Sequence, residues 1–224
     1  MVCDMKPQDP LHSFIAHTNH GHDPARTASW RTRAQELHEV FVRDLVEAHD
    51  FCPWAKSARA AQRSKIVALF VPELQPFCVG PLVHEAYEAV EVWQLVLPDV
   101  TLSAMGWRAY VADLEQTLRR DGHDLPWAFA AFHPEHPGRA ESIGGTIGML
   151  RRSPLPTIQL VRLDVLDRVR ARASERVEAL PAQNQRTLQQ WLHDKIQRQQ
   201  HAKWLKDGKE LQAEIARAAA SKPR

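Results

Sequence analysis

Four short apolar runs recur along the chain, and they constrain its fold more than any other feature of the sequence. They are five to seven residues long and rich in β-branched and aromatic residues, which is typical of buried β-strands. The runs are Lys65–Val71, Trp93–Leu97, Trp127–Phe132 and Thr157–Arg162. Helical patterns lie between and after them. We therefore expect an α+β fold with one sheet of about four strands, helices packed on it, and further C-terminal helices.

Apolar periodicity predicts the helices. From Ser29 to Asp50, apolar residues recur at three- and four-residue steps, the spacing of one buried helical face. Proline disfavours helical geometry in the residue before it, so Pro53 predicts that this helix ends near Cys52. Further helices are expected at 82–92, 106–120, 165–180 and 186–205.

The chain is expected to hold one domain with an appendage at each end. Residues 1–26 are polar, rich in His and interrupted by proline, which is typical of a loosely ordered tail. Residues 27–206 are expected to form a single α+β domain, and residues 207–224 a frayed basic tail.

Charge, cysteine content and hydropathy exclude several classes of protein. A net charge of +2 gives no support to specific nucleic-acid binding. Cys3, Cys52 and Cys78 make neither a disulfide framework nor a CxxC zinc pattern. The apolar runs are too short to cross a bilayer, and the N-terminus lacks the apolar segment of a signal peptide. We expect a cytoplasmic protein with no membrane partner.

Cys52 is the first candidate for a functional residue. It lies among Phe51, Pro53 and Trp54, at the predicted C-terminal end of a helix. The negative end of the helix dipole disfavours a thiolate, which argues against a self-activated nucleophile. A metal ion can still deprotonate the sulfur. A buried structural cysteine is the alternative that stays open.

His133 and His136 are the next candidates. His133 follows a predicted strand and precedes Pro134, so it lies at a strand end, where ligand sites of α/β sheets gather. An imidazole there can act as an acid, a base or a metal ligand. His136 lies three residues further on, which is a weak metal-binding pattern. Both can equally be loop histidines without a functional role.

Arginines provide candidate anion contacts. Arg151 and Arg152 precede a segment stiffened by Pro154 and Pro156, and a guanidinium on a stiff turn can bind a carboxylate, a phosphate or a haem propionate. Arg162 lies inside a predicted strand, where it reaches solvent or pairs with an anion. The alternative is that these are ordinary surface arginines.

The segment 134–156 is predicted to be a long functional loop, because it is rich in Gly and Pro and joins two strands. Its Gly144–Gly148 stretch lacks the Gly-Lys-Ser/Thr ending of a phosphate loop. No GxSxG, HExxH or zinc-deaminase signature is present.

Three of these segments together resemble an uncharacterised bacterial family, domain-of-unknown-function family 1415. They are Phe51–Lys56 (FCPWAK), Phe132–Glu135 (FHPE) and Arg152–Arg162 (RSPLPTIQLVR). Members of that family carry Cys-Pro-Phe-Ala, Phe-His-Pro-Asp and Arg-Ser-Pro-Tyr-Pro-Thr segments in the same order. The resemblance covers about residues 29–200 and implies no particular reaction.

The chain departs from the family pattern at several polar or aromatic positions close to these segments. Trp54 replaces the usual Phe, and the other departures are Arg151 for Asn, His136 for an aromatic residue, Leu155 for Tyr and Gln159 for His. A substrate that differs from that of typical members is therefore expected.

A more distant similarity links the same segments to the YqcI/YcgG-type proteins, some of which are haem-dependent oxygenases that hydroxylate nitrogen in amino acids or guanidines. This resemblance implies haem held by His133 or Cys52, with arginines facing the propionates. Tryptophans such as Trp54 would then contribute to an apolar haem pocket.

These observations leave three functional hypotheses. The first is a haem-dependent oxygenase or oxidase that acts on a small nitrogen-containing or anionic metabolite. The second is a cofactor-free enzyme with Cys52 as nucleophile, His133 as base and Arg152 as anion contact. The third is a non-enzymatic binding protein whose basic C-terminal helices form the contact surface, or join two copies as a homodimer.

Overall fold

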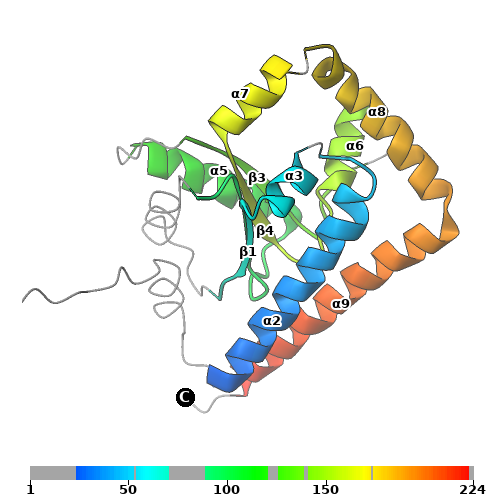
Figure 1. Cartoon of the computed structure of the whole chain (residues 1–224). Helices are drawn as coiled ribbons and strands as arrows, with labels where there is room; N and C mark the ends of the chain where they lie inside the picture. The colour runs from blue at the N-terminus through cyan, green and yellow to red at the C-terminus, as the bar shows by residue number, and fades with distance from the viewer. Residues whose placement is uncertain are drawn as a thin grey trace, which may run out of the picture.

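A computed structural model describes residues 24–52, 54–70, 89–120, 126–138, 141–172 and 174–221 of the 224-residue chain (Figure 1). Among the described elements, three helical segments precede β1 and β2, one helix each separates β2 from β3 and β3 from β4, and three helices follow β4. The elements are α2 (Pro24–Phe41), η1 (Val42–Glu47, a π-helix), α3 (Ala55–Ala60), β1 (Ser64–Ala68), β2 (Val92–Val96), α5 (Ala104–Arg120), β3 (Trp127–Phe132), α6 (Ile143–Leu150), β4 (Thr157–Arg162), α7 (Leu163–Arg172), α8 (Ser174–His193) and α9 (Lys195–Ala220).

The four strands form one open sheet in the order β1-β2-β4-β3. β1 and β2 run parallel, whereas β4 is antiparallel to both β2 and β3. β3 and β4 have the bounds that the apolar runs predicted, and β2 is shifted by one residue. This arrangement confirms the predicted α+β fold with one four-stranded sheet and C-terminal helices.

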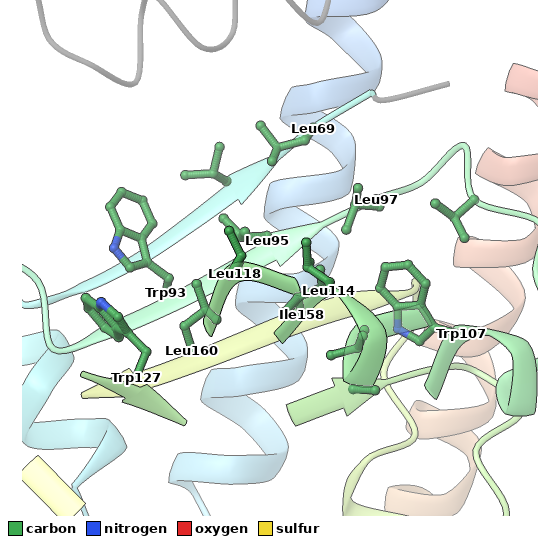
Figure 2. Packing of buried hydrophobic residues seen from close by; sticks show 14 of the residues in the cluster. Leu69, Trp93, Leu95, Leu97, Trp107, Leu114, Leu118, Trp127, Ile158 and Leu160 are labelled. Carbon is green, nitrogen blue, oxygen red and sulfur yellow. The ribbon is translucent and has the colours of Figure 1, made fainter. Parts of the chain in front are cut away.

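Helix α5 covers one face of the sheet. Its buried residues Trp107, Val111, Leu114 and Leu118 recur at three- and four-residue steps and so form one apolar stripe. Figure 2 shows three of these side chains with alternate residues of the strands, namely Trp93, Leu95, Trp127, Ile158 and Leu160. Because successive strand residues point to opposite faces, the residues between them face away from α5.

Helices α2 and α9 pack against the opposite face. Figure 1 shows them side by side, and residue pairs such as Trp30–Glu214 and Phe41–Trp204 establish that they run antiparallel. Their shared core joins Trp30, Ala34, Leu211 and Ile215 to Val96 of β2. Two chain segments that are distant in sequence therefore form one layer.

Gly208 allows α9 to lie against the Pro154 turn. A Cβ added at Gly208 would be 2.0 Å from the carbonyl oxygen of Pro154, a distance that no side chain tolerates. We expect Gly208→Ala to lower the free energy of unfolding by about 1–3 kcal/mol, because overpacking forces the backbone apart. Urea unfolding measures this change.

Gly144→Ala is the matched control for Gly208→Ala. A Cβ at Gly144, in the first turn of α6, would meet no atom within 4 Å. Alanine is the better helix former, so this variant is expected to be unchanged or more stable by up to about 1 kcal/mol. Equal unfolding midpoints for the wild type and Gly208→Ala would contradict the proposed packing role of Gly208.

Several expectations were wrong at the C-terminal end. The frayed tail predicted for 207–224 is wrong over 207–220, which forms the end of α9 and buries Gly208, Leu211 and Ile215. The division between the last two helices lies at Asp194, which caps α9, and Pro181 lies inside α8. The apolar face of α9 packs on α2.

Two further differences concern the loops. The segment 134–156 contains the helix α6, whose first turn is capped by the Ser142 hydroxyl accepting from the amide of Gly145. The glycine-rich stretch Gly144–Gly148 is therefore helical and not a flexible loop. The predicted helix 82–92 and the His-rich tail lie outside the described residues, except for 89–92 and for 24–26, which begin α2.

Candidate functional site

A pocket of about 400 Å³ lies on the sheet face opposite α5. This volume is typical of small-molecule sites. Aromatic and aliphatic side chains form most of its wall, including Phe41, Phe51, Trp54, Phe132, Val92, Val161, Ile147 and Leu150. The polar residues that line it are Glu47, Cys52, Ser64, Gln94, Arg151, Gln159 and Asn184. We refer to it as the Cys52 pocket.

The π-helix η1 shapes one side of this pocket. The amide of Ala48 donates to the carbonyl of Arg43, and the amide of Phe51 donates to that of Val46, both with the wider i→i+5 spacing. Asp50, with φ 51°, then reverses the chain in the left-handed region. π-Helical turns are rare and occur often at functional sites. Here the turn brings Glu47, Phe51 and Cys52 into the pocket wall.

Cys52 lies ahead of α3, and the amide of Ala55 donates to its carbonyl oxygen at 3.1 Å. The backbone amides of Ala55 and Trp54 near the thiol lower its pKa. Burial nevertheless dominates and raises the pKa of the thiol to about 12. The sulfur is therefore a neutral thiol at pH 7. Burial thus makes Cys52 a weak free nucleophile.

Glu47 is a buried carboxylate that is already neutralised. Arg59 donates to both of its oxygens at 2.7–2.9 Å, in the bidentate arrangement typical of strong Arg–carboxylate pairs. The Glu47 side chain is only 4% exposed, whereas Arg59 is about half exposed. The pocket wall thus contains a carboxylate without offering a free negative charge.

Two carboxamides lie at the floor of the pocket. Gln94 of β2 and Gln159 of β4 are direct partners in the antiparallel register, and both line the cavity. Behind Gln94, the ring of His38 on α2 is fully buried, and its Nε2 contacts Oε1 of Gln94. Sequence reasoning missed Gln94 and His38, although a Gln inside the apolar run WQLVL was an available signal.

His133 does not line this pocket. Its Nε2 donates to the carbonyl of Leu102 at 3.0 Å, and its Nδ1 accepts from the amide of Glu135 at 3.0 Å. Both ring nitrogens are therefore engaged: one hydrogen bond lies within the turn after β3, and the other joins this turn to the segment before α5. Burial lowers the pKa of His133, in agreement with a neutral ring. A base or a metal ligand needs a free nitrogen, which this geometry does not provide.

His136 also belongs to the turn. Its Nδ1 donates to the carbonyl of Pro137 at 2.9 Å, and its buried Nε2 has no hydrogen-bond partner among the described residues. Burial, followed by the positive charges of Arg151, Arg108 and Arg152, lowers the pKa of His136. It is therefore neutral. It does not join His133 as a metal pair, and no three His, Cys, Asp or Glu side chains gather in the described part of the chain.

Arg152 ties this turn to α9. Its Nε donates to the carbonyl of His136 at 2.8 Å and its Nη2 to that of Gly138 at 3.2 Å, while its own carbonyl contacts His201. Its guanidinium thus donates to backbone carbonyls, and Arg152 does not line the pocket.

Exchanging Arg152 for methionine is expected to destabilise the protein by about 1.5–3 kcal/mol, because two carbonyls lose a charged donor. The same exchange at Arg151 is the matched control. The Arg151 side chain makes no hydrogen bond or ion pair with the described residues and lies close to the like charge of Arg108, so the Arg151 variant should be about as stable as the wild type. Thermal melts compare the two variants; equal losses would contradict the assignment.

Arg151 lines the pocket at the end of α6. Burial, followed by the charge of Arg108, lowers the pKa of its guanidinium, which remains a cation at neutral pH. Arg162 lies elsewhere and pairs with Asp164 through two contacts of 2.8 and 2.6 Å. Of the predicted arginines, only Arg151 is available to a ligand in the pocket.

The predicted centre is therefore divided. Cys52, Trp54 and Arg151 share the pocket, whereas His133, His136 and Arg152 build the neighbouring turn. The hypothesis of a Cys52–His133 catalytic pair finds no geometric support.

Comparison with known proteins gives one match. The model of a family described as "Protein of unknown function (DUF1415)" matches residues 33–198, which include the whole pocket. No curated protein and no solved structure matches the chain. Within the residues described, no helix is both long and apolar enough to pass through a membrane.

Proposed function

The chain belongs to the DUF1415 family, and we propose that it is a haem-dependent oxidoreductase, an oxygenase or oxidase, whose Cys52 pocket would hold the haem with the Cys52 sulfur bound to the iron. The observation that carries the proposal is a free cysteine in the wall of an aromatic-lined cavity. Bound haem would supply the oxygen and electron-transfer chemistry, which protein side chains lack.

The properties of Cys52 fit an iron ligand better than a nucleophile. With a pKa of about 12, the free thiol has no thiolate to attack a substrate at neutral pH. A ferric iron deprotonates a coordinating thiol through its own charge, so the same burial is no obstacle to ligation. The backbone amides of Ala55 and Trp54, which lower the pKa of the thiol, would then help to stabilise the negative sulfur.

Other residues of the pocket fit the remainder of the cofactor. Phe41, Phe51, Trp54 and Phe132 offer the apolar surface that a porphyrin face needs. Arg151 is a cation without a carboxylate partner among the described residues and would hold a propionate. His133, the other expected axial ligand, does not fit, because both of its ring nitrogens already carry hydrogen bonds outside the pocket.

The colour of the purified full-length protein tests the proposal first. A Soret absorption band after purification, or after titration with haemin, is the expected result. Titration should saturate at one haem per chain and quench tryptophan fluorescence, since Trp54 lines the pocket. A colourless protein that takes up no haemin under these conditions would overturn the proposal.

A further inference from the structure

The floor of the Cys52 pocket contains two glutamines, and their contacts with the protein decide whether they offer hydrogen-bond donors or acceptors to a ligand. We infer that Gln94 and Gln159 bind the acceptor end of the substrate, a carboxylate or an amide carbonyl on a mainly apolar molecule, and that the pocket rejects a cationic head group. The inference rests on the pocket being the ligand site of the proposed function, but it needs no haem.

The first support is the register of the sheet. Gln94 and Gln159 lie directly opposite each other on the antiparallel strands β2 and β4, so their side chains leave the same face next to each other. Both line the cavity, whereas their neighbours Trp93, Leu95 and Leu160 face α5. Two neighbouring carboxamides can bind a planar polar group of a ligand through two hydrogen bonds.

The second support is the contact with His38, which fixes the orientation of the Gln94 amide. His38 is buried, and its Nδ1 has no hydrogen-bond partner among the described residues. A buried ring keeps its proton where an acceptor exists, so Nε2 carries the hydrogen and donates to Oε1 of Gln94. The Nε2-protonated tautomer of His38 thus follows from the acceptor beside Nε2 and from the lack of a described partner for Nδ1.

This contact leaves the Nε2 amide group of Gln94 for the ligand. No described residue accepts a hydrogen bond from that nitrogen, yet it is not among the fully buried atoms without a partner. Since Gln94 lines the cavity, its two N–H donors are accessible from the pocket. A ligand atom that satisfies them must be an acceptor.

The third support is the balance of charge. Glu47 is the carboxylate among the described lining residues, and Arg59 neutralises it from outside the cavity. In the haem-free protein, Arg151 adds a positive charge on the same wall. An amine or guanidine head group would meet donors and a cation but no free anion, and it would lose its hydration without compensation. Of the two substrate types expected from the sequence, the anionic one fits.

Three small probes of similar size separate these head groups: benzoate, benzamide and benzylamine, which is protonated at neutral pH. Their binding to the purified full chain is measured by ligand-observed NMR and by quenching of tryptophan fluorescence. We expect benzoate and benzamide to bind at least about tenfold more tightly than benzylamine, since a hydrogen bond to a charged or polar partner is worth about that factor.

Substitutions at Gln94 test whether the floor of the pocket causes the preference for benzoate and benzamide over benzylamine. Gln94→Leu should weaken benzoate and benzamide about tenfold, whereas Gln94→Glu should reverse the preference in favour of benzylamine. Gln212→Leu is the control, because Gln212 bonds the carbonyl of Val100 outside the pocket. His38→Leu should act like Gln94→Leu, and His38→Gln, which restores a donor to Gln94, should recover part of the preference. Circular dichroism confirms that each variant is folded.

Three outcomes would overturn the inference: no binding of any probe, equal binding of benzylamine and benzoate, or unchanged affinities in a folded Gln94→Leu variant. Haem uptake is scored separately by the Soret band. A colourless protein with the expected probe preference would refute the haem proposal alone, and a haem protein without that preference would refute the inference alone.

Discussion

Replacing Cys52 by serine is expected to abolish the Soret band of the haem-titrated protein or to shift it strongly. The sulfur is the candidate ligand in the pocket wall, and a serine hydroxyl at the same place is a poor ligand for haem iron. The ferrous carbon-monoxide complex of the wild type should show the spectrum of thiolate ligation, and that of the variant should not. The change leaves the packing volume almost unaltered.

His133→Ala is the informative control for the Cys52 experiment. If Cys52 is the ligand, removing the His133 ring should leave the spectrum unchanged while lowering stability, because two hydrogen bonds of the turn are lost. The opposite pattern, a spectrum that survives Cys52→Ser and disappears in His133→Ala, would contradict the assignment of the ligand. Circular dichroism at the same pH separates loss of haem from loss of fold.

Acid should destabilise this fold through His38. Burial lowers the pKa of His38 from 6.5 to about 4, despite the contact with Gln94. At pH 7 the ring is neutral in both the folded and the unfolded chain. As the pH falls from about 6.5 to about 4, the unfolded chain binds a proton that the folded protein excludes, so stability decreases. The total loss is about 3 kcal/mol at 1.36 kcal/mol per pKa unit.

Urea unfolding of the wild type and of His38→Gln at about pH 7 and about pH 5 measures this effect. The variant lacks the titrating ring, so its stability should fall by about 2 kcal/mol less than that of the wild type over this range. A smaller dependence should remain, because burial also lowers the pKa of His133, His136 and His201. Identical pH dependences would show that His38 is not excluded from protonation in the folded state.

The strands were predictable because a strand that is buried on both faces has apolar residues at successive positions. Runs such as Trp127–Phe132 and Thr157–Arg162 carry apolar residues at successive positions, and the structure gives these two strands the predicted bounds. α6 was not predictable in the same way. Three glycines in eight residues weaken the helical signal, and the helix depends on the Ser142 cap and on the close packing of Gly148 against Pro137.

The candidate site was only half predictable, because sequence distance does not tell which face of a sheet a residue occupies. Cys52 and Arg151 were identified and do share the pocket. His133 was placed with them, but alternation along β3 sends Phe132 to the pocket and the His133 ring to the other side, toward Leu102. Adjacent Arg151 and Arg152 likewise diverge, one to the pocket and one to the turn.

The antiparallel pairing of α2 with α9 has a consequence for how the chain reaches its native state. Trp30 donates to Glu214 across 184 positions of sequence, and both helices contribute to one core cluster. During synthesis, the residues of α2 that pack on α9 cannot find their partners until almost the entire described chain has left the ribosome. Contacts of such long range slow folding, because a large loop must close before they form. Premature termination between α8 and α9 should therefore yield a product that aggregates or is degraded, even though the sheet and its pocket residues are already complete in sequence.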